Sequence, residues 1–148
     1  MKFFRAARLA PLLAAVFVSG PLSSALADSV IPKATDGRPL NLGFEAGDLR
    51  DWQANGKAFD QALIRGDVVS QRRADMKSNH EGEFWIGGFE RVGDDPKGTL
   101  TSVPFKVTHP WASFLVAGGP WSETRVELVD SATGQTFFKI SGTESETL

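Results

Sequence analysis

The sequence predicts an all-β domain built in layers. Residues 98–116 contain two strand-like runs that meet at His109-Pro110. From Val103 to Val107 every second residue is apolar, which is typical of a strand with one buried face, whereas residues 112–116 are apolar at nearly every position, which indicates a strand covered on both faces. Fourteen of the 15 glycines lie after residue 27 among short apolar runs, and no twelve-residue stretch there carries a helical stripe. We therefore expect many turns and few helices.

The N-terminal residues have the pattern of an export signal. Three basic residues precede an apolar run at residues 9–18, and Ala25-Leu26-Ala27 supplies the small-x-small pattern that signal peptidase requires. The apolar run is shorter than the roughly 20 residues needed to span a bilayer. We expect residues 1–27 to be a signal peptide, the protein to be secreted to the periplasm or the extracellular space, and the cleaved chain to have no membrane association.

The charge and the cysteine content restrict the possible partners of the protein and the ways in which it can be stabilised. Removal of residues 1–27 takes away three of the 16 basic residues and none of the 18 acidic ones, which leaves a formal net charge of −5. A nucleic-acid partner is disfavoured, because phosphate binding requires a cationic face. The chain has no cysteine, so packing or a bound ion, rather than disulfides, must stabilise it after export.

The remaining chain divides into a flexible leader at residues 28–39 and one β-domain at residues 40–148. The last two expected strands are joined by residues 131–134, whose glycine can adopt positive φ, so we expect a hairpin with Val126 and Leu128 on the same face as Phe138 and Ile140. The expected strands are 40–45, 58–64, 83–89, 98–107, 111–116, 123–130 and 135–141.

A set of short motifs resembles one known family. The chain opens with Asn41-x-x-Phe-Glu-x-Gly-Asp-Leu-x-x-Trp52, and further pieces follow in the same order at residues 66–67, 72–73, 83–87, 98–102, 113–119 and 124–128. This pattern resembles the jelly-roll, carbohydrate-binding-like modules found beside levanase-type (family 32) glycoside hydrolases and in large secreted bacterial proteins. The resemblance implies an antiparallel β-sandwich of galactose-binding-like type over roughly residues 41–148. The family pattern continues with a Gly-Trp-Gly-His-like loop and a closing strand with paired Asp residues, so we expect this chain to be a C-terminally truncated module.

No catalytic residues are assigned from the sequence. His80 and His109 lack zinc-ligand spacing, and no nucleophile elbow or phosphate loop is present. Glu81 and Glu83, with Asp75 and Glu90, could supply the two carboxylates of a glycosidase, but carboxylates in loops and at strand ends are more often solvated surface groups. We expect a non-catalytic protein, at most an accessory module of a glycoside hydrolase.

The residue types that build sugar-binding sites are present. Indole faces pack against the apolar side of a sugar ring, and planar polar groups hydrogen-bond adjacent hydroxyls. Tryptophans in a small sandwich are also common core residues, which is the reading we favour for Trp52, and the loop at residues 72–75 could instead be a self-neutralising surface segment. The candidates are Trp121, which follows a Gly-Gly-Pro turn, Trp85, Trp111, Arg72, Arg73, Asp75, Glu81, Glu83, Glu90 and Arg91.

Modules of this kind resemble one another in holding a structural Ca²⁺ near their first and last strands. Calcium binds six to eight oxygen ligands from carboxylates and carbonyls. The resemblance implies Glu45 and Asp48 as weak calcium candidates; the alternative is that both residues shape the turn at Gly47.

The function expected from the sequence is that of a secreted carbohydrate-binding-like module that binds fructan or another polysaccharide. Two alternatives stay open: a structural or protein-interaction β-sandwich module, and a fragment of a levanase-like glycoside hydrolase. A sandwich without its closing strands would also expose a sheet edge, through which it could pair with a partner chain or form a dimer.

Overall fold

The computed structural model describes residues 30–145 and shows an all-β protein with little helix. The strands form two-stranded antiparallel sheets: β1 (Trp52–Gly56) pairs with β4 (Gly98–Ser102), β2 (Leu63–Arg65) with β3 (Phe84–Ile86), and β5 (Arg125–Val129) with β6 (Thr136–Ser141). Helical structure in this part is confined to the 3-10 turn η1 (Val69–Gln71) and the short α1 (Phe89–Val92), and neither could cross a membrane. The signal peptide expected at residues 1–27 lies outside the described residues.

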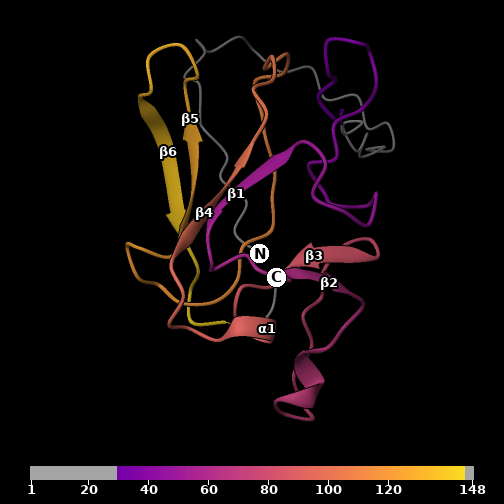
Figure 1. Cartoon of the computed structure of the whole chain (residues 1–148), viewed down its shortest axis with the longest axis vertical. Helices are drawn as coiled ribbons and strands as arrows, with labels where there is room; N and C mark the ends of the chain where they lie inside the picture. Colours follow the sequence, from indigo (N-terminus) through magenta and orange to yellow (C-terminus); the bar gives the residue numbers. More distant parts are fainter. Residues whose placement is uncertain (1–29, 146–148) are drawn as a thin grey trace, which may run out of the picture.

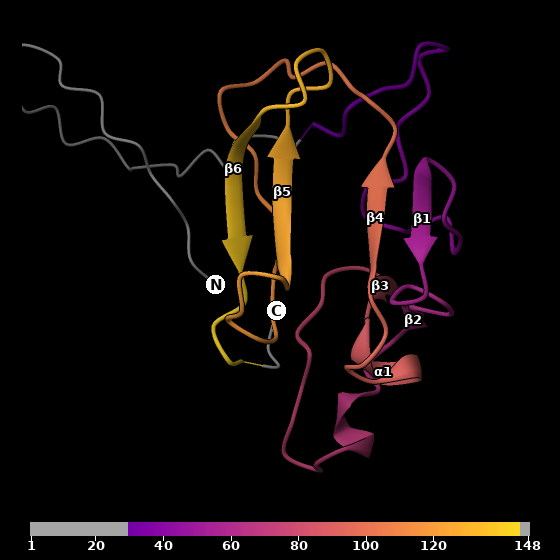
Figure 2. The same cartoon turned by 60° about the vertical axis from the view of Figure 1, so that its left-hand side comes forward.

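The sheets stand side by side as separate small units. The β5–β6 hairpin lies beside the β1–β4 sheet, with β6 outermost in both views (Figures 1 and 2). The β2–β3 sheet, α1 and η1 gather toward the end of the molecule to which β6 runs (Figure 1). The all-β prediction is confirmed, and several strands are shorter than predicted.

The sheet of β1 and β4 encloses a long nested segment. These strands are neighbours in space, yet residues 57–97, which include β2, η1, β3 and α1, lie between them in sequence. Gly56 pairs with Gly98 at the neck of this segment, and the Lys57 amide donates to the Lys97 carbonyl at 2.9 Å. A Cβ on Gly98 would lie 2.5 Å from the Asn55 carbonyl oxygen, so the two chain segments can approach this closely only with glycine there.

The best-packed part of the described chain lies in and next to this nested segment. The buried apolar residues among residues 30–145 are Leu40, Ala62, Ile64 and Val69. Ser78 is fully buried with them, whereas Phe137 on β6 is 63% exposed. The core is therefore concentrated around β2 and η1 and does not extend under the hairpin.

The predicted hairpin is confirmed together with its register. Val126 lies opposite Ile140 and Leu128 opposite Phe138, so the four side chains share one face. The ring of Phe114 meets Phe138 edge-on at a centroid distance of 5.9 Å. In the connecting turn Gly134 has a φ of +71°, the conformation for which glycine was expected there.

The strand predicted at residues 40–45 is wrong, because side-chain hydrogen bonds hold this segment in turns. The Asn41 side-chain oxygen accepts from the Ala46 amide at 2.9 Å, and its amide group donates to the Asp48 carbonyl at 2.9 Å. Phe44 has a φ of +66°, which no strand residue adopts. Hydrogen bonds between an Asn side chain and nearby backbone groups compete in this way with the backbone hydrogen bonds of a strand ladder.

Other strand predictions need correction in position or length. The strand predicted at 111–116 is absent, because no neighbouring strand supplies a ladder for this apolar run. The strand predicted at 98–107 ends at Ser102, and the segment predicted at 83–89 is a strand only over 84–86, since the backbone turns into α1 after Gly87-Gly88. The strand predicted at 58–64 begins only at Leu63, after a turn. β1 was not predicted.

Candidate functional site

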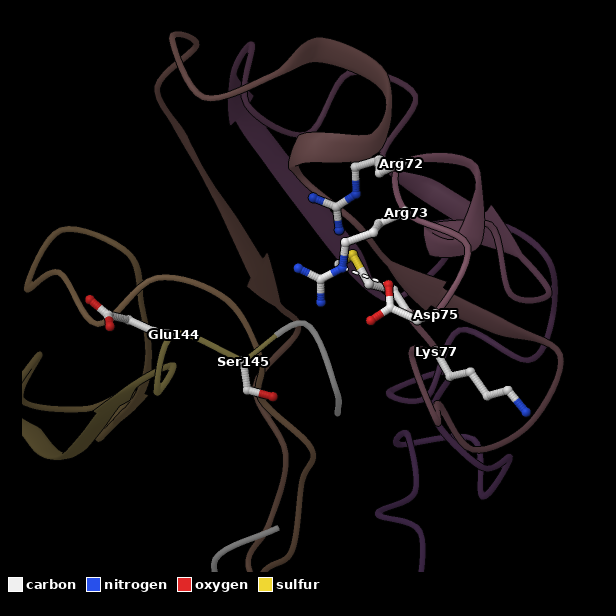
Figure 3. A pocket seen from close by; sticks show the side chains of 7 residues that line it. Arg72, Arg73, Asp75, Lys77, Glu144 and Ser145 are labelled. Atoms are coloured by element: carbon white, nitrogen blue, oxygen red, sulfur yellow. Dashed lines mark hydrogen bonds and ion pairs between the residues drawn. The ribbon is translucent and has the colours of Figure 1, made fainter.

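Three of the predicted sugar-binding residues line one hollow. This hollow has a volume of about 490 Å³ and lies between the loop after η1 and the end of the described chain (Figure 3). Arg72 and Arg73 extend toward the side on which Glu144 and Ser145 lie, while Lys77 extends away from it (Figure 3). We call it the arginine hollow; its lining residues are Arg72, Arg73, Asp75, Met76, Lys77, Glu144 and Ser145.

Arg72 is fixed in place between the arginine hollow and a second, smaller hollow. Its guanidinium lies 4.7 Å from the centre of the Phe89 ring and 3.3 Å from the Glu90 carboxylate, whose side chain is only 9% exposed. The smaller hollow, of about 140 Å³, is lined by Arg72, Phe89, Glu90 and also Arg91. Because α1 carries Phe89 and Glu90, this helix positions Arg72, which lines both hollows.

Arg73 and Asp75 form an exposed pair in the wall of the arginine hollow. The Arg73 Nε donates to the Asp75 Oδ1 at 2.7 Å, and both side chains are about two-thirds exposed or more. An exposed pair of this kind contributes little to stability, so its polar atoms can exchange partners at low cost. A planar guanidinium and a carboxylate held side by side suit adjacent hydroxyl groups of a sugar.

The segment with Trp121 is bonded to the opposite wall of the arginine hollow. The Gly118 amide donates to the Ser145 carbonyl at 2.6 Å, and the Glu144 amide donates to the Gly118 carbonyl at 2.9 Å. Trp121 lies three residues after Gly118, within about 11 Å of extended chain. Its side chain is 62% exposed.

Trp111 is equally exposed, at 60%, but no described hydrogen bond connects its segment to the arginine hollow. It follows residues 103–110, which run at the end of the molecule away from η1 in both views (Figures 1 and 2). The structure thus connects Trp121, which the sequence singled out by its Gly-Gly-Pro turn, to the arginine hollow, and leaves Trp111 apart from it.

Trp85 has a structural environment that sequence reasoning missed. Its Nε1 donates to the Gly66 carbonyl at 2.9 Å, and the His80 ring stacks on it at 6.0 Å. His80 Nδ1 shares a 2.6 Å hydrogen bond with Ser78 Oγ, and the Ser78 amide donates to Asp67 at 3.0 Å. Ser78 is fully buried, so its hydroxyl cannot attack a substrate. Asp67 was the residue in the sequence that could have indicated this environment. It lies two residues before η1, a position where an Asp side chain often accepts a hydrogen bond from the backbone.

The two remaining glutamates lie outside both hollows. Glu83 pairs with Arg65 across the β2–β3 ladder at 3.1 Å, and Glu81 is exposed in the turn before β3. Neither residue is placed across a described cavity from a second carboxylate, as the two groups of a glycosidase would be.

Glu45 and Asp48 do not provide a calcium cage in the described structure. The Glu45 carboxylate accepts from the backbone amides of Glu83 at 2.9 Å and Phe84 at 3.2 Å. Asp48 pairs with Arg50 at 2.6 Å, and this hydrogen bond lowers the pKa of Asp48. Within residues 30–145 no group of three or more acidic or histidine side chains could hold a metal ion.

Comparison with known proteins shows a partial similarity but no family. No family model matches the chain, and no solved structure matches it significantly. Over 107 residues the chain is 29% identical to a protein of Aspergillus rugulosus named "Putative glycosyl hydrolase ecdE". The match covers 72% of this chain and 14% of the relative, so the chain spans a small fraction of that protein's length.

Proposed function

We propose that this protein is a carbohydrate-binding module that binds a polysaccharide at the arginine hollow and Trp121. The observation that carries the proposal is that Trp121 is connected to the hollow. Its exposed indole follows, within three residues, the Gly118 backbone that is hydrogen-bonded to Glu144 and Ser145. Glu144 and Ser145 form one wall of the hollow. In this arrangement the indole stacks on a sugar ring while Arg73 and Asp75 bind its hydroxyls.

The likeness to a protein named as a glycosyl hydrolase supports a carbohydrate-related role. Because the match covers 14% of that relative, we assign to this chain an accessory binding role and not the chemistry of a whole hydrolase. Export through residues 1–27 and a jelly-roll sandwich fold are parts of the same proposal. Fructan is the first polysaccharide to test, since levanase-type enzymes act beside modules that this chain resembles.

The proposal is tested by affinity electrophoresis of the purified chain in gels that contain a fructan, a neutral glucan, a galactan or a polyuronate. Retardation by at least one polysaccharide is expected. Trp121→Ala and Arg73→Ala should each weaken that binding about tenfold, which corresponds to about 1.4 kcal/mol. No retardation by any polysaccharide at millimolar sugar would contradict the proposal.

Two matched controls separate the site from general effects of the substitutions. Trp111→Ala removes an equally exposed indole from a segment not connected to the hollow. Arg50→Ala breaks an exposed ion pair with Asp48, two residues away, that resembles the pair of Arg73 and Asp75. Both controls should bind as the parent does; loss of binding in Trp111→Ala with retention in Trp121→Ala would place the site elsewhere.

A further inference from the structure

The smaller hollow beside Arg72 is too small to hold a ligand of its own. Its volume is about 140 Å³, whereas ligand pockets in proteins usually measure about 300–1,000 Å³. The arginine hollow, at about 490 Å³, lies within that range. Because Arg72 lines both hollows, the smaller one adjoins the larger one. The smaller hollow is lined by Val68, Gln71, Arg72, Phe89, Glu90 and Arg91.

Arg72 gives the boundary between the two hollows a fixed shape. Its side chain is only 27% exposed, and its guanidinium is held by the Phe89 ring at 4.7 Å and by the Glu90 carboxylate at 3.3 Å. A side chain that is already held in place loses little further conformational entropy when a ligand contacts it. A ligand can therefore lie across Arg72 without first ordering it.

The smaller hollow offers chemical groups that also suit a sugar. Phe89 is 43% exposed and supplies apolar ring surface. Gln71 on η1 and Arg91 on α1, two elements at the same end of the molecule (Figure 1), are exposed, and within residues 30–145 neither side chain forms a hydrogen bond or an ion pair. An amide and a guanidinium together provide donors and an acceptor for hydroxyl groups. An aromatic ring beside planar polar groups thus occurs at both hollows.

We propose that the smaller hollow is a second sugar subsite, which binds the next part of the polysaccharide chain that occupies the arginine hollow. This inference rests on the proposed function. One sugar contacts Arg73 and Asp75, and a sugar further along the same chain packs on Phe89 and hydrogen-bonds to Gln71 and Arg91. Because the two sugars are covalently linked, filling the second subsite needs no second association event, so affinity rises with chain length. The ligand class is a polysaccharide recognised over several linked sugars.

Titration calorimetry with oligosaccharides of increasing length tests the second subsite. The ligands are prepared from the polysaccharide that retards the chain most strongly in the gels, and run from the disaccharide to the octasaccharide, with fructo-oligosaccharides first. The affinity of the parent should rise about tenfold along the series, which corresponds to about 1.4 kcal/mol, and then level off. Arg91→Ala should remove most of this gain, whereas Trp121→Ala should lower the affinity at every length and keep the gain.

Two further variants make the result specific. Gln71→Ala changes η1 instead of α1 and should reduce the same gain, so the test does not depend on the folding of one variant. Lys106→Ala removes an exposed cation from the segment at residues 103–110, which runs away from η1 (Figures 1 and 2), and should keep the full gain.

The outcomes separate this inference from the proposed function. If the parent binds oligosaccharides with an affinity independent of their length, or if Arg91→Ala and Gln71→Ala both keep the full gain, the second subsite is overturned while binding at the arginine hollow stands. If none of the polysaccharides retards the parent chain, both proposals fail together.

Discussion

At the residue scale, Asp51 has an almost fully covered carboxylate that is bonded to residues well before it in sequence. Its side chain is 4% exposed and accepts two hydrogen bonds from Arg38 and one from the Asn41 amide. The Arg38 guanidinium is the main cause that lowers the pKa of Asp51 to about 2. These hydrogen bonds to the Asp51 carboxylate therefore hold the residue in a positive-φ conformation, with a φ of +69°, directly before β1.

Asp51→Asn should lower the urea midpoint at pH 7, and the difference from the parent should shrink as the pH falls from about 4 to about 2. The pKa of an unfolded Asp is about 3.9. Because the folded pKa is lower, the stabilisation is complete above the unfolded value and is lost as the pH falls through the folded one. Asp36→Asn is the control, since Asp36 is 65% exposed and lies 3.6 Å from the same Arg38. A difference between parent and Asp51→Asn that is independent of pH would contradict this account.

At the element scale, Glu45 fastens the loop before β1 to the start of β3. Its two carboxylate oxygens receive the backbone amides of Glu83 and Phe84. Gly82 must be glycine for this contact, because it has a φ of +78° and a Cβ there would collide with the Glu45 carboxylate. The segment at residues 40–45, which was predicted as a strand, therefore forms no strand itself. Its Glu45 side chain instead holds the start of β3 in place.

Glu45→Ala should destabilise the protein by about 1–2 kcal/mol in urea unfolding, since two backbone amides lose a charged acceptor. Glu45→Gln keeps one acceptor oxygen and should cost less. Gly82→Ala should destabilise as well, and the double variant should lose less than the sum of the two, because both changes disrupt one contact. Glu81→Ala, a neighbouring exposed carboxylate, should leave stability within about 0.5 kcal/mol of the parent. Additive losses would mean that Glu45 and Gly82 act independently.

At the scale of the whole molecule, little apolar surface is fully buried. Four apolar residues are buried among residues 30–145, while large apolar side chains such as Val107 and Phe137 are more than 60% exposed. Exposure of apolar surface is the main source of the heat-capacity change on unfolding. Calorimetry should therefore give a heat-capacity change on unfolding that is less than the usual ~12–15 cal/mol/K per residue. A value within that range would contradict the small core.

The sequence predicted those elements whose signals are local. The hairpin was correct in position and register because alternation and a glycine turn both lie within residues 125–141. β1 was missed because its residues, Trp-Gln-Ala-Asn-Gly, include no β-branched residue and end in Asn-Gly, which is typical of a turn, and its pairing with β4 depends on a partner more than forty residues away. The apolar run at 111–116 was wrongly predicted as a strand, because periodicity alone does not show whether a neighbouring strand is available to pair with it.

The same distinction applies to the candidate site. Residue type identified Arg72, Arg73 and Asp75, and their closeness in sequence already implied a common loop. Their position opposite Glu144 and Ser145 depends on the fold, as does the connection of the Trp121 segment to that wall. The buried bond between Ser78 and His80 could not be predicted, because nothing in two polar loop residues signals that they are covered.

The glycine pair at the neck of residues 57–97 has a consequence for how this protein could have evolved. Because Gly56 and Gly98 are direct ladder partners, the two ends of the nested segment meet at about the separation of neighbouring strands, near 5 Å. A segment with adjacent ends can be inserted into, or removed from, a host without moving the rest of the chain. The fully buried side chains Ile64, Val69 and Ser78 all belong to it. The molecule thus has the layout of an outer β-framework with one inserted segment, and a short Gly-containing turn joining β1 directly to β4 would convert these two strands into an ordinary hairpin.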